Sequence, residues 1–260
     1  FIRRALEKAG LPHIPVISLN FNGMEKNEGF TLSLPLFVNA AKAIVYGDLL
    51  MRCLYRVRPY EKVEGSANEL HKKWNEICID SLVNPKSKYE FKTVCEGIVE
   101  AFDNFEIDES IVKPKVGIVG EILVKYMPLA NNYLVDLLER EGAEAVVPDL
   151  LDFMNYSFYN SEYKYENYNT KYSGLLGSRL ALKAVAFIRR HAVRALKKSK
   201  RFSPPVPIDE IAEMTKPFLS IGNQYGEGWF LTGEMVELIH DNVPNIVCTQ
   251  PFGCLPNHVV

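Results

Sequence analysis

Two thiols and an imidazole lie close together in residues 245–258, NIVCTQPFGCLPNH. Cys248 ends an apolar run, Cys254 follows in a turn rich in Pro and Gly, and His258 comes four residues later. Parallel α/β sheets bind ligands where a strand gives way to a loop at the carboxyl edge. These residue types fit a zinc site, a nucleophile or simple packing, so the segment is the first candidate site.

A second candidate is the loop at residues 222–229, GNQYGEGW. Gly226 and Gly228 let the backbone approach a ligand or a metal cluster closely, although glycines in a loop also serve turns. Glu227 is the candidate acid, base or ligand. The loop precedes a predicted helix, whose N-terminus can hold an anionic group.

The chain has five cysteines, an odd number whose spacing does not resemble a disulfide framework. This use of cysteine predicts a reducing, cytoplasmic compartment. Cys53, Cys78 and Cys95 fall within helical patterns and are expected to pack as small apolar residues. Cys248 is expected either to pack among apolar side chains or to belong to the site. Cys254 lies in a turn, where burial contributes less to stability.

Composition is that of an ordinary soluble globular chain, with 47% hydrophobic residues, 24% charged residues and a formal net charge of -2. The near-neutral total predicts no nucleic-acid partner. A basic run at residues 189–201 is interpreted as the solvated face of one helix, with phosphate contact as the alternative. The chain has no uninterrupted apolar stretch of membrane-spanning length, so no membrane partner is expected.

The first third of the chain predicts the end of one α/β domain followed by helices. Residues 1–10 read as the last turns of a helix and residues 14–19 as a strand, so we expect residues 1–33 to end a domain that begins upstream. A helical segment then covers residues 34–110. It includes a long helix at residues 34–56 and a capping box formed by Ser66 and Glu69.

Residues 111–260 predict a second α/β domain, cut at its C-terminal end. Strands at residues 116–122 and 145–147, joined by a helix at 130–141, form a βαβ unit and hence a parallel sheet. A further strand is expected at 246–248. The first strand-to-helix turn lacks G-x-G-x-x-G, which argues against dinucleotide binding. The predicted fold is two doubly wound (Rossmann-like, flavodoxin-like) parallel-sheet domains with a helical connection.

Six tyrosines alternate with polar residues between positions 156 and 172. The low aliphatic content predicts a loop or an exposed helix face, which either lines a ligand or partner surface or is an inert cover. Helices are expected on the C-terminal side of this stretch at residues 180–198, 207–218 and 234–240.

Several of these segments resemble a known family, and together they span most of the chain. They are KVGIVGEILVKYMPLANN at residues 115–132, VVPDLLD at 146–152, GEGWFLTGEM at 226–235 and QPFGCLPNH at 250–258. PVISL at 15–19 and YGDLLMR at 46–52 also fit. The chain resembles the dehydratase-like part of the 2-hydroxyacyl-CoA dehydratase and CoA-substrate-specific activase family, most closely in the large fused form.

The resemblance implies an oxygen-sensitive [4Fe-4S] protein that receives one electron from an ATP-hydrolysing activase and passes it to an acyl-CoA substrate, in a homo- or heterodimer. Cys254 is the implied cluster ligand, Cys248 a second candidate, and His258 a hydrogen-bond donor near the cluster or a surface residue. Gly226 and Gly228 lie where backbone N–H groups can reach the cluster.

Two departures from the family pattern affect this interpretation. The activase's nucleotide-binding motifs are absent, so the chain is not expected to hydrolyse ATP. One cysteine cannot hold a cluster, so other segments or a partner must supply the remaining ligands. The alternative function is a noncatalytic docking module for the activase, with the tyrosine-rich stretch at residues 156–172 as the contact.

Overall fold

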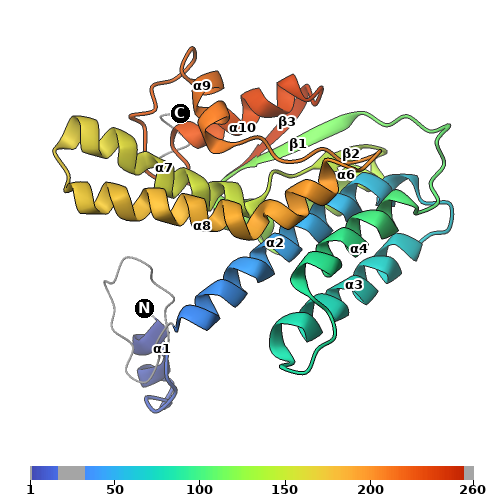
Figure 1. Ribbon diagram of the computed structural model, residues 1–260, viewed down its shortest axis with the longest axis horizontal. Helices are drawn as coiled ribbons and strands as arrows, with labels where there is room; N and C mark the ends of the chain where they lie inside the picture. Colours follow the sequence, from blue (N-terminus) through green and yellow to red (C-terminus); the bar gives the residue numbers. More distant parts are fainter. Residues whose placement is uncertain (1, 17–32, 255–260) are drawn as a thin grey trace. The chain divides into compact units, whose positions relative to one another are not determined.

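The computed structural model describes residues 2–16 and 33–254 (Figure 1). The protein is a mixed α/β chain, as expected from its sequence. It divides into two compact units, Phe1–Ala40 and Ala41–Val260, each of which is described by itself.

The first unit contains helix α1, Ile2–Lys8, and the start of helix α2. Arg3 donates a hydrogen bond to the carbonyl oxygen of Val16 at 3.3 Å, which folds the segment after α1 back on the helix. Residues 14–16 form no strand, and the rest of the strand expected at 14–19 lies outside the described residues.

A parallel sheet organises the second unit. Its described strands have the order β2-β1-β3, with Val116 opposite Ala145 and Gly117 opposite Ile246. The predicted βαβ unit is therefore confirmed, and the strand expected at 246–248 joins the same sheet. The strands are β1, Lys115–Gly120; β2, Glu144–Val146; and β3, Asn245–Thr249.

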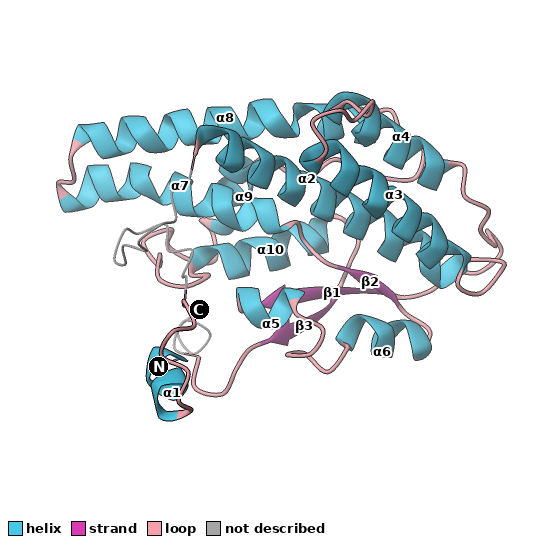
Figure 2. Ribbon diagram, turned by 90° about the horizontal axis from the view of Figure 1, so that it is seen from below, coloured by secondary structure: helices cyan, strands magenta, loops and turns pink. Residues whose placement is uncertain are grey.

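Helices cover both faces of this sheet (Figure 2). Successive side chains of a strand point to opposite faces. Val119 packs with Leu231 and Leu238 of helix α10, Trp229–His240, whereas Ile118 packs with residues of helix α6, Leu134–Arg140. A short helix, α5, Ile122–Tyr126, precedes α6, so the crossover that was expected as one helix at 130–141 contains two.

The remaining described helices pack mainly on one another around an apolar core. Cys53, Cys95, Ile98 and Phe102 are fully buried there. Helices α7 and α8 run side by side as a hairpin, and α8 also packs against α4 (Figure 1). These helices are α2, Leu34–Val57; α3, Ser66–Val83; α4, Phe91–Asp103; α7, Leu150–Tyr168; and α8, Tyr172–Leu196, with the 3-10 turn η1, Arg58–Tyr60. Helix α9, Ile208–Thr215, packs mainly on α10 instead.

The start of α3 differs from its prediction. No side chain of the helix caps it, so the Ser66 and Glu69 capping box was wrong. Glu61 instead accepts the N–H groups of Gly65 at 2.8 Å and Ala67 at 2.7 Å. A carboxylate from the preceding turn satisfies the same orphan donors that a capping box would satisfy.

One described helix, Leu34–Tyr60, is long and apolar enough to cross a membrane by length and composition alone. Its second half lies in the core, where Val45, Leu49 and Val57 are almost fully buried. The mixed α/β class and the parallel sheet are thus observed, while the doubly wound form of two domains stays a prediction.

Candidate functional site

The carboxyl ends of β1 and β3 are locked together by backbone contacts. Gly120 has φ 131°, and a Cβ there would lie 1.8 Å from the carbonyl oxygen of Thr249. That same oxygen accepts the N–H of Glu121 at 2.9 Å. Only glycine permits this approach. The segments that follow β1 and β3 therefore begin next to each other at the carboxyl edge of the sheet.

The glycine loop at residues 222–229 reaches the same edge through Glu227. This carboxylate is buried, and its Oε1 accepts the N–H of Ile122, the first residue of α5, at 2.9 Å. Glu227 therefore ties the loop to the turn after β1, a role that the sequence alone did not predict for it.

Gly228 in this loop is required for packing. Its φ is 50°, and a Cβ would lie 2.2 Å from the carbonyl oxygen of Asn223 and 2.6 Å from the hydroxyl of Tyr156. The carbonyl oxygen of Gly226 accepts a hydrogen bond from that hydroxyl at 3.2 Å. Both glycines thus have a structural function that stands beside their predicted place near a cofactor.

A buried ion pair lies next to these loops. Lys125 Nζ of α5 and Glu234 Oε1 of α10 are 2.6 Å apart, and their side chains are 3% and 1% exposed. Burial raises the pKa of Glu234, and the lysine ammonium opposes that shift. Sequence reasoning missed this pair. The available signal was a single charge within each of two otherwise apolar segments, ILVKY and WFLTGEMV.

The two thiols of the candidate site lie at or just after the carboxyl end of β3: Cys248 is the last but one residue of the strand, and Cys254 lies in the turn that follows. Cys248 is exposed, so the packing alternative is wrong for it. Partial desolvation, and then the negative character of Cys254, Glu234 and Glu227, raise the pKa of the Cys248 thiol. A bound metal ion would favour the thiolate over the thiol.

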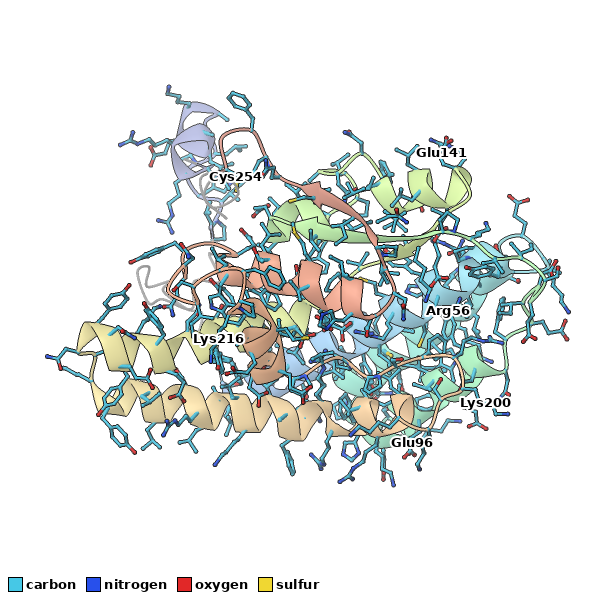
Figure 3. The ribbon with its side chains drawn as sticks, turned by 90° about the horizontal axis from the view of Figure 1, so that it is seen from above. Arg56, Glu96, Glu141, Lys200, Lys216 and Cys254 are labelled. Atoms are coloured by element: carbon cyan, nitrogen blue, oxygen red, sulfur yellow. The ribbon has the colours of Figure 1, made fainter. Side chains whose placement is uncertain are left out.

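Cys254 is half-buried in the turn that follows β3. Its N–H donates to the carbonyl oxygen of Pro251 at 3.2 Å, which closes the turn and fixes the backbone that carries the thiol. Figure 3 shows Cys254 far from Glu96 and Lys200 on the helical side of the molecule. His258 lies outside the described residues.

The other three cysteines confirm their predicted packing. Cys53, Cys78 and Cys95 are buried in the helical core. Burial raises the pKa of each thiol, to about 12 for Cys78, so all three stay protonated near neutral pH. A protonated, enclosed thiol is a poor metal ligand.

The available thiols can be compared with what an iron-sulfur cluster needs. A [4Fe-4S] cluster normally takes four thiolates. Cys248 and Cys254 offer two at one edge of the sheet, and among residues 2–16 and 33–254 no group of three or more His, Cys, Asp or Glu side chains is placed to hold a metal ion. The described residues therefore fit the cluster only as part of a ligand set shared with another segment or chain.

Beneath the site, a charge network joins α2, α7 and α8. Arg189 donates to the carboxylates of Asp149 and Asp152, and Arg52 donates to Asp149 at 2.9 Å. Asp48 accepts the first two N–H groups of α7 at 2.8 and 3.0 Å, and burial followed by the charge of Asp149 raises its pKa. The expected solvated basic face at 189–201 is thus wrong for Arg189, which is buried.

The tyrosine-rich stretch forms the second half of α7 and the start of α8. Tyr156 is buried and stacks on Phe230 with ring centroids 5.3 Å apart. Tyr165, Tyr168 and Tyr172 are exposed near the tip of the hairpin. The stretch is therefore helical and not a loop. Its beginning at Tyr156 lies in the core, and its end at the hairpin tip lies on the surface.

No protein-family model, curated protein or solved structure matches this chain.

Proposed function

We propose that the protein is a cytoplasmic iron-sulfur redox component resembling 2-hydroxyacyl-CoA dehydratases. It accepts one electron from an ATP-dependent activase, for radical dehydration or reduction of an acyl-CoA-type substrate. Its two α/β domains would be doubly wound, as in that family, and it would work as a homo- or heterodimer. A [4Fe-4S] cluster would supply the one-electron chemistry when bound.

One observation carries the proposal: three segments of the resemblance, distant in sequence, meet at one sheet edge. The hydrogen bond from Ile122 to Glu227 joins residues 115–132 to 226–235. The hydrogen bond from Glu121 to Thr249 joins residues 115–132 to the strand that leads into 250–258. Segments that share a site are expected to converge in this way, because ligands bind where neighbouring loops leave a parallel sheet.

Within this proposal each residue has a distinct part. Cys254 is the cluster ligand and Cys248 the second candidate, since both thiols lie at this edge. Gly226 and Gly228 bring backbone close to the same region. Glu227 holds the loop in place through Ile122 and is the candidate proton carrier, since the described residues give it no cation partner.

The ligand assignment is tested by replacing Cys254. The protein and its Cys254→Ala and Cys248→Ala variants are purified without oxygen, and iron and acid-labile sulfide are measured. Loss of most iron and sulfide in Cys254→Ala is expected, because a missing thiolate leaves the cluster open. Cys78→Ala is the matched control and should keep the wild-type content, since that thiol is in the core. Unchanged iron in Cys254→Ala would contradict the assignment.

The exposed tyrosines at the hairpin tip favour a second candidate, a noncatalytic module that docks an activase. Tyr168 and Tyr172 are 60% and 56% exposed, and aromatic side chains are enriched in protein interfaces. An iron-free preparation that is nevertheless dimeric, and that loses activase binding on Tyr168→Ser with Tyr172→Ser, would favour this candidate over the redox component.

A further inference from the structure

Helix α8 has one face that the described residues leave uncovered. Its inner face buries Leu175, Ala192, Ala195 and Leu196 against neighbouring helices. Its outer face carries a row of large apolar side chains at helical spacing, which we call the α8 stripe. The stripe consists of Tyr172 (56% exposed), Leu176 (45%), Leu180 (59%) and Phe187 (64%).

The α8 stripe is long and narrow. Its residues recur at intervals of four or seven, which places them on one side of the helix. At a rise of about 1.5 Å per residue it extends for about 22 Å, the length of about four helical turns. These dimensions suit a second helix that lies along α8, because the apolar face that an amphipathic helix buries in a groove has a similar width.

The charged side chains of α8 itself are all basic. Helix α8, YSGLLGSRLALKAVAFIRRHAVRAL, contains no acidic residue. Lys183 is exposed, makes no ion pair among the described residues, and lies along the stripe between Leu180 and Phe187. The guanidinium of Arg190 lies over the ring of Phe187 at 3.4 Å from its centroid.

This charge pattern selects the occupant. A second copy of the stripe would bring the cations of two α8 helices together, and Glu162 of α7, which is already paired with Arg179, offsets little of that repulsion. An anionic membrane fits poorly as well. Lys183 interrupts the apolar row, where hydrocarbon offers no counter-charge, and Glu162 of the adjacent α7 lies near the stripe's N-terminal end, bound to Arg179.

We propose that the α8 stripe docks an amphipathic helix of a partner protein, whose apolar seam lies on Leu176, Leu180 and Phe187 and whose acidic flanks pair with Lys183 and Arg190. The apolar row supplies the contact area, and the cations set the register and exclude basic partners. This surface is separate from Cys254 and does not depend on the redox proposal.

The probe is a designed helical peptide with Leu at its a and d positions, Glu at its e and g positions, a fluorescent label, and a length of about 15 residues to match the stripe. Binding to the whole protein is followed by fluorescence anisotropy. Saturable binding is expected, with at least about a tenfold loss of affinity for Leu180→Ser with Phe187→Ser and a smaller loss for Lys183→Glu. All three positions are exposed, and circular dichroism verifies the fold of each variant.

The matched control is Leu129→Ser, which removes an apolar side chain that is 70% exposed elsewhere. It should bind the peptide as the wild type does. Equal binding of a peptide with Lys in place of Glu would overturn the proposal, as would unchanged binding by the stripe variants. Self-association of the protein would also overturn the proposal, if the stripe variants abolish it and the acidic peptide does not inhibit it. Binding to phosphatidylserine vesicles with the same two properties would overturn it as well.

Discussion

At the scale of residues, the buried pair of Lys125 and Glu234 fastens α5 to α10 beneath the candidate site. Lys125→Met leaves a carboxyl group in the core without its partner, so we expect a loss of about 3–5 kcal/mol in the free energy of unfolding. Urea denaturation measures it. The double variant Lys125→Met with Glu234→Met should recover much of that loss, because no buried charge remains unpaired.

The exposed pair of Lys92 and Glu96, 4.0 Å apart, provides the comparison. Lys92→Met should change the free energy of unfolding by less than about 1 kcal/mol, as exposed pairs usually do. Equal effects of Lys92→Met and Lys125→Met would contradict the role assigned to the buried pair.

Gly120 allows a second residue-scale prediction. Gly120→Ala places a methyl group against the carbonyl oxygen of Thr249 at a backbone φ that favours glycine. The junction of β1 and β3 must then open, so we expect a loss of more than about 2 kcal/mol in the free energy of unfolding and weaker retention of any group held at this edge. Gly174→Ala, on open surface in α8, should instead stabilise by about 0.5–1 kcal/mol.

Both glycine variants are compared by thermal unfolding followed by circular dichroism. Similar melting temperatures for Gly120→Ala and Gly174→Ala would mean that the close approach of β1 and β3 is not required.

At the scale of elements, the packing of α10 against its neighbours makes stability depend on pH. Burial, and then the charge of Asp152, raise the pKa of Glu237 in α10 from its ordinary value of 4.5 to about 8, while Arg52 opposes the shift and Glu234 and Asp241 add to it. Between these values the folded state holds a proton that the unfolded state has lost. This group's contribution therefore falls as pH rises from about 5 to 8.

Glu237→Gln removes that contribution. Urea denaturation at pH 5 and pH 8 should show that the stability of the variant decreases less over this interval than that of the wild type, with the greater gain at pH 8. Asp48, Asp152 and Glu234, whose pKa values burial also raises, are present in both proteins, so the difference between the two pH profiles reports Glu237. The same pH dependence in both would contradict the raised pKa.

Local pattern predicted those elements whose residues interact with near neighbours in sequence. The strands at β1 and β2, the helix α2 and the buried helical cysteines all follow from apolar spacing and β-branched runs. Two features were wrong for different reasons. At the start of α3 a competing local acceptor, Glu61, four and six positions from Gly65 and Ala67, takes the place of the expected cap. Arg189 is drawn inward by the tertiary fold, because its partners Asp149 and Asp152 are 40 and 37 positions away in sequence.

The candidate site was predictable only in part for a related reason. A parallel sheet collects loops at its carboxyl edge, so the place of Cys248 and Cys254 follows from the β3 pattern and the βαβ unit. No local pattern reports that Glu227 reaches Ile122, which is 105 positions away, or that Lys125 meets Glu234, 109 positions away. Such pairings appear only when the helices are packed.

At the scale of the whole molecule, we propose a sheet edge with two thiols that is completed by ligands from elsewhere. The helical layer then has a further exposed surface, which runs from the tyrosines at the hairpin tip into the α8 stripe through Tyr172, and through which a redox component can meet its partners. A chain of this kind would combine electron transfer at the sheet with docking on the helices, and the two functions can be lost separately by mutation.

Iron-edge anomalous diffraction from crystals of the protein purified and grown without oxygen tests the iron-sulfur proposal without recourse to activity. We expect anomalous density within about 2.3 Å of the Sγ atom of Cys254, as for a metal–thiolate bond, beyond the carboxyl ends of β1 and β3. The density should be absent in the Cys254→Ala variant. Iron bound elsewhere, with Cys254 free of metal in a cluster-loaded protein, would contradict the proposal.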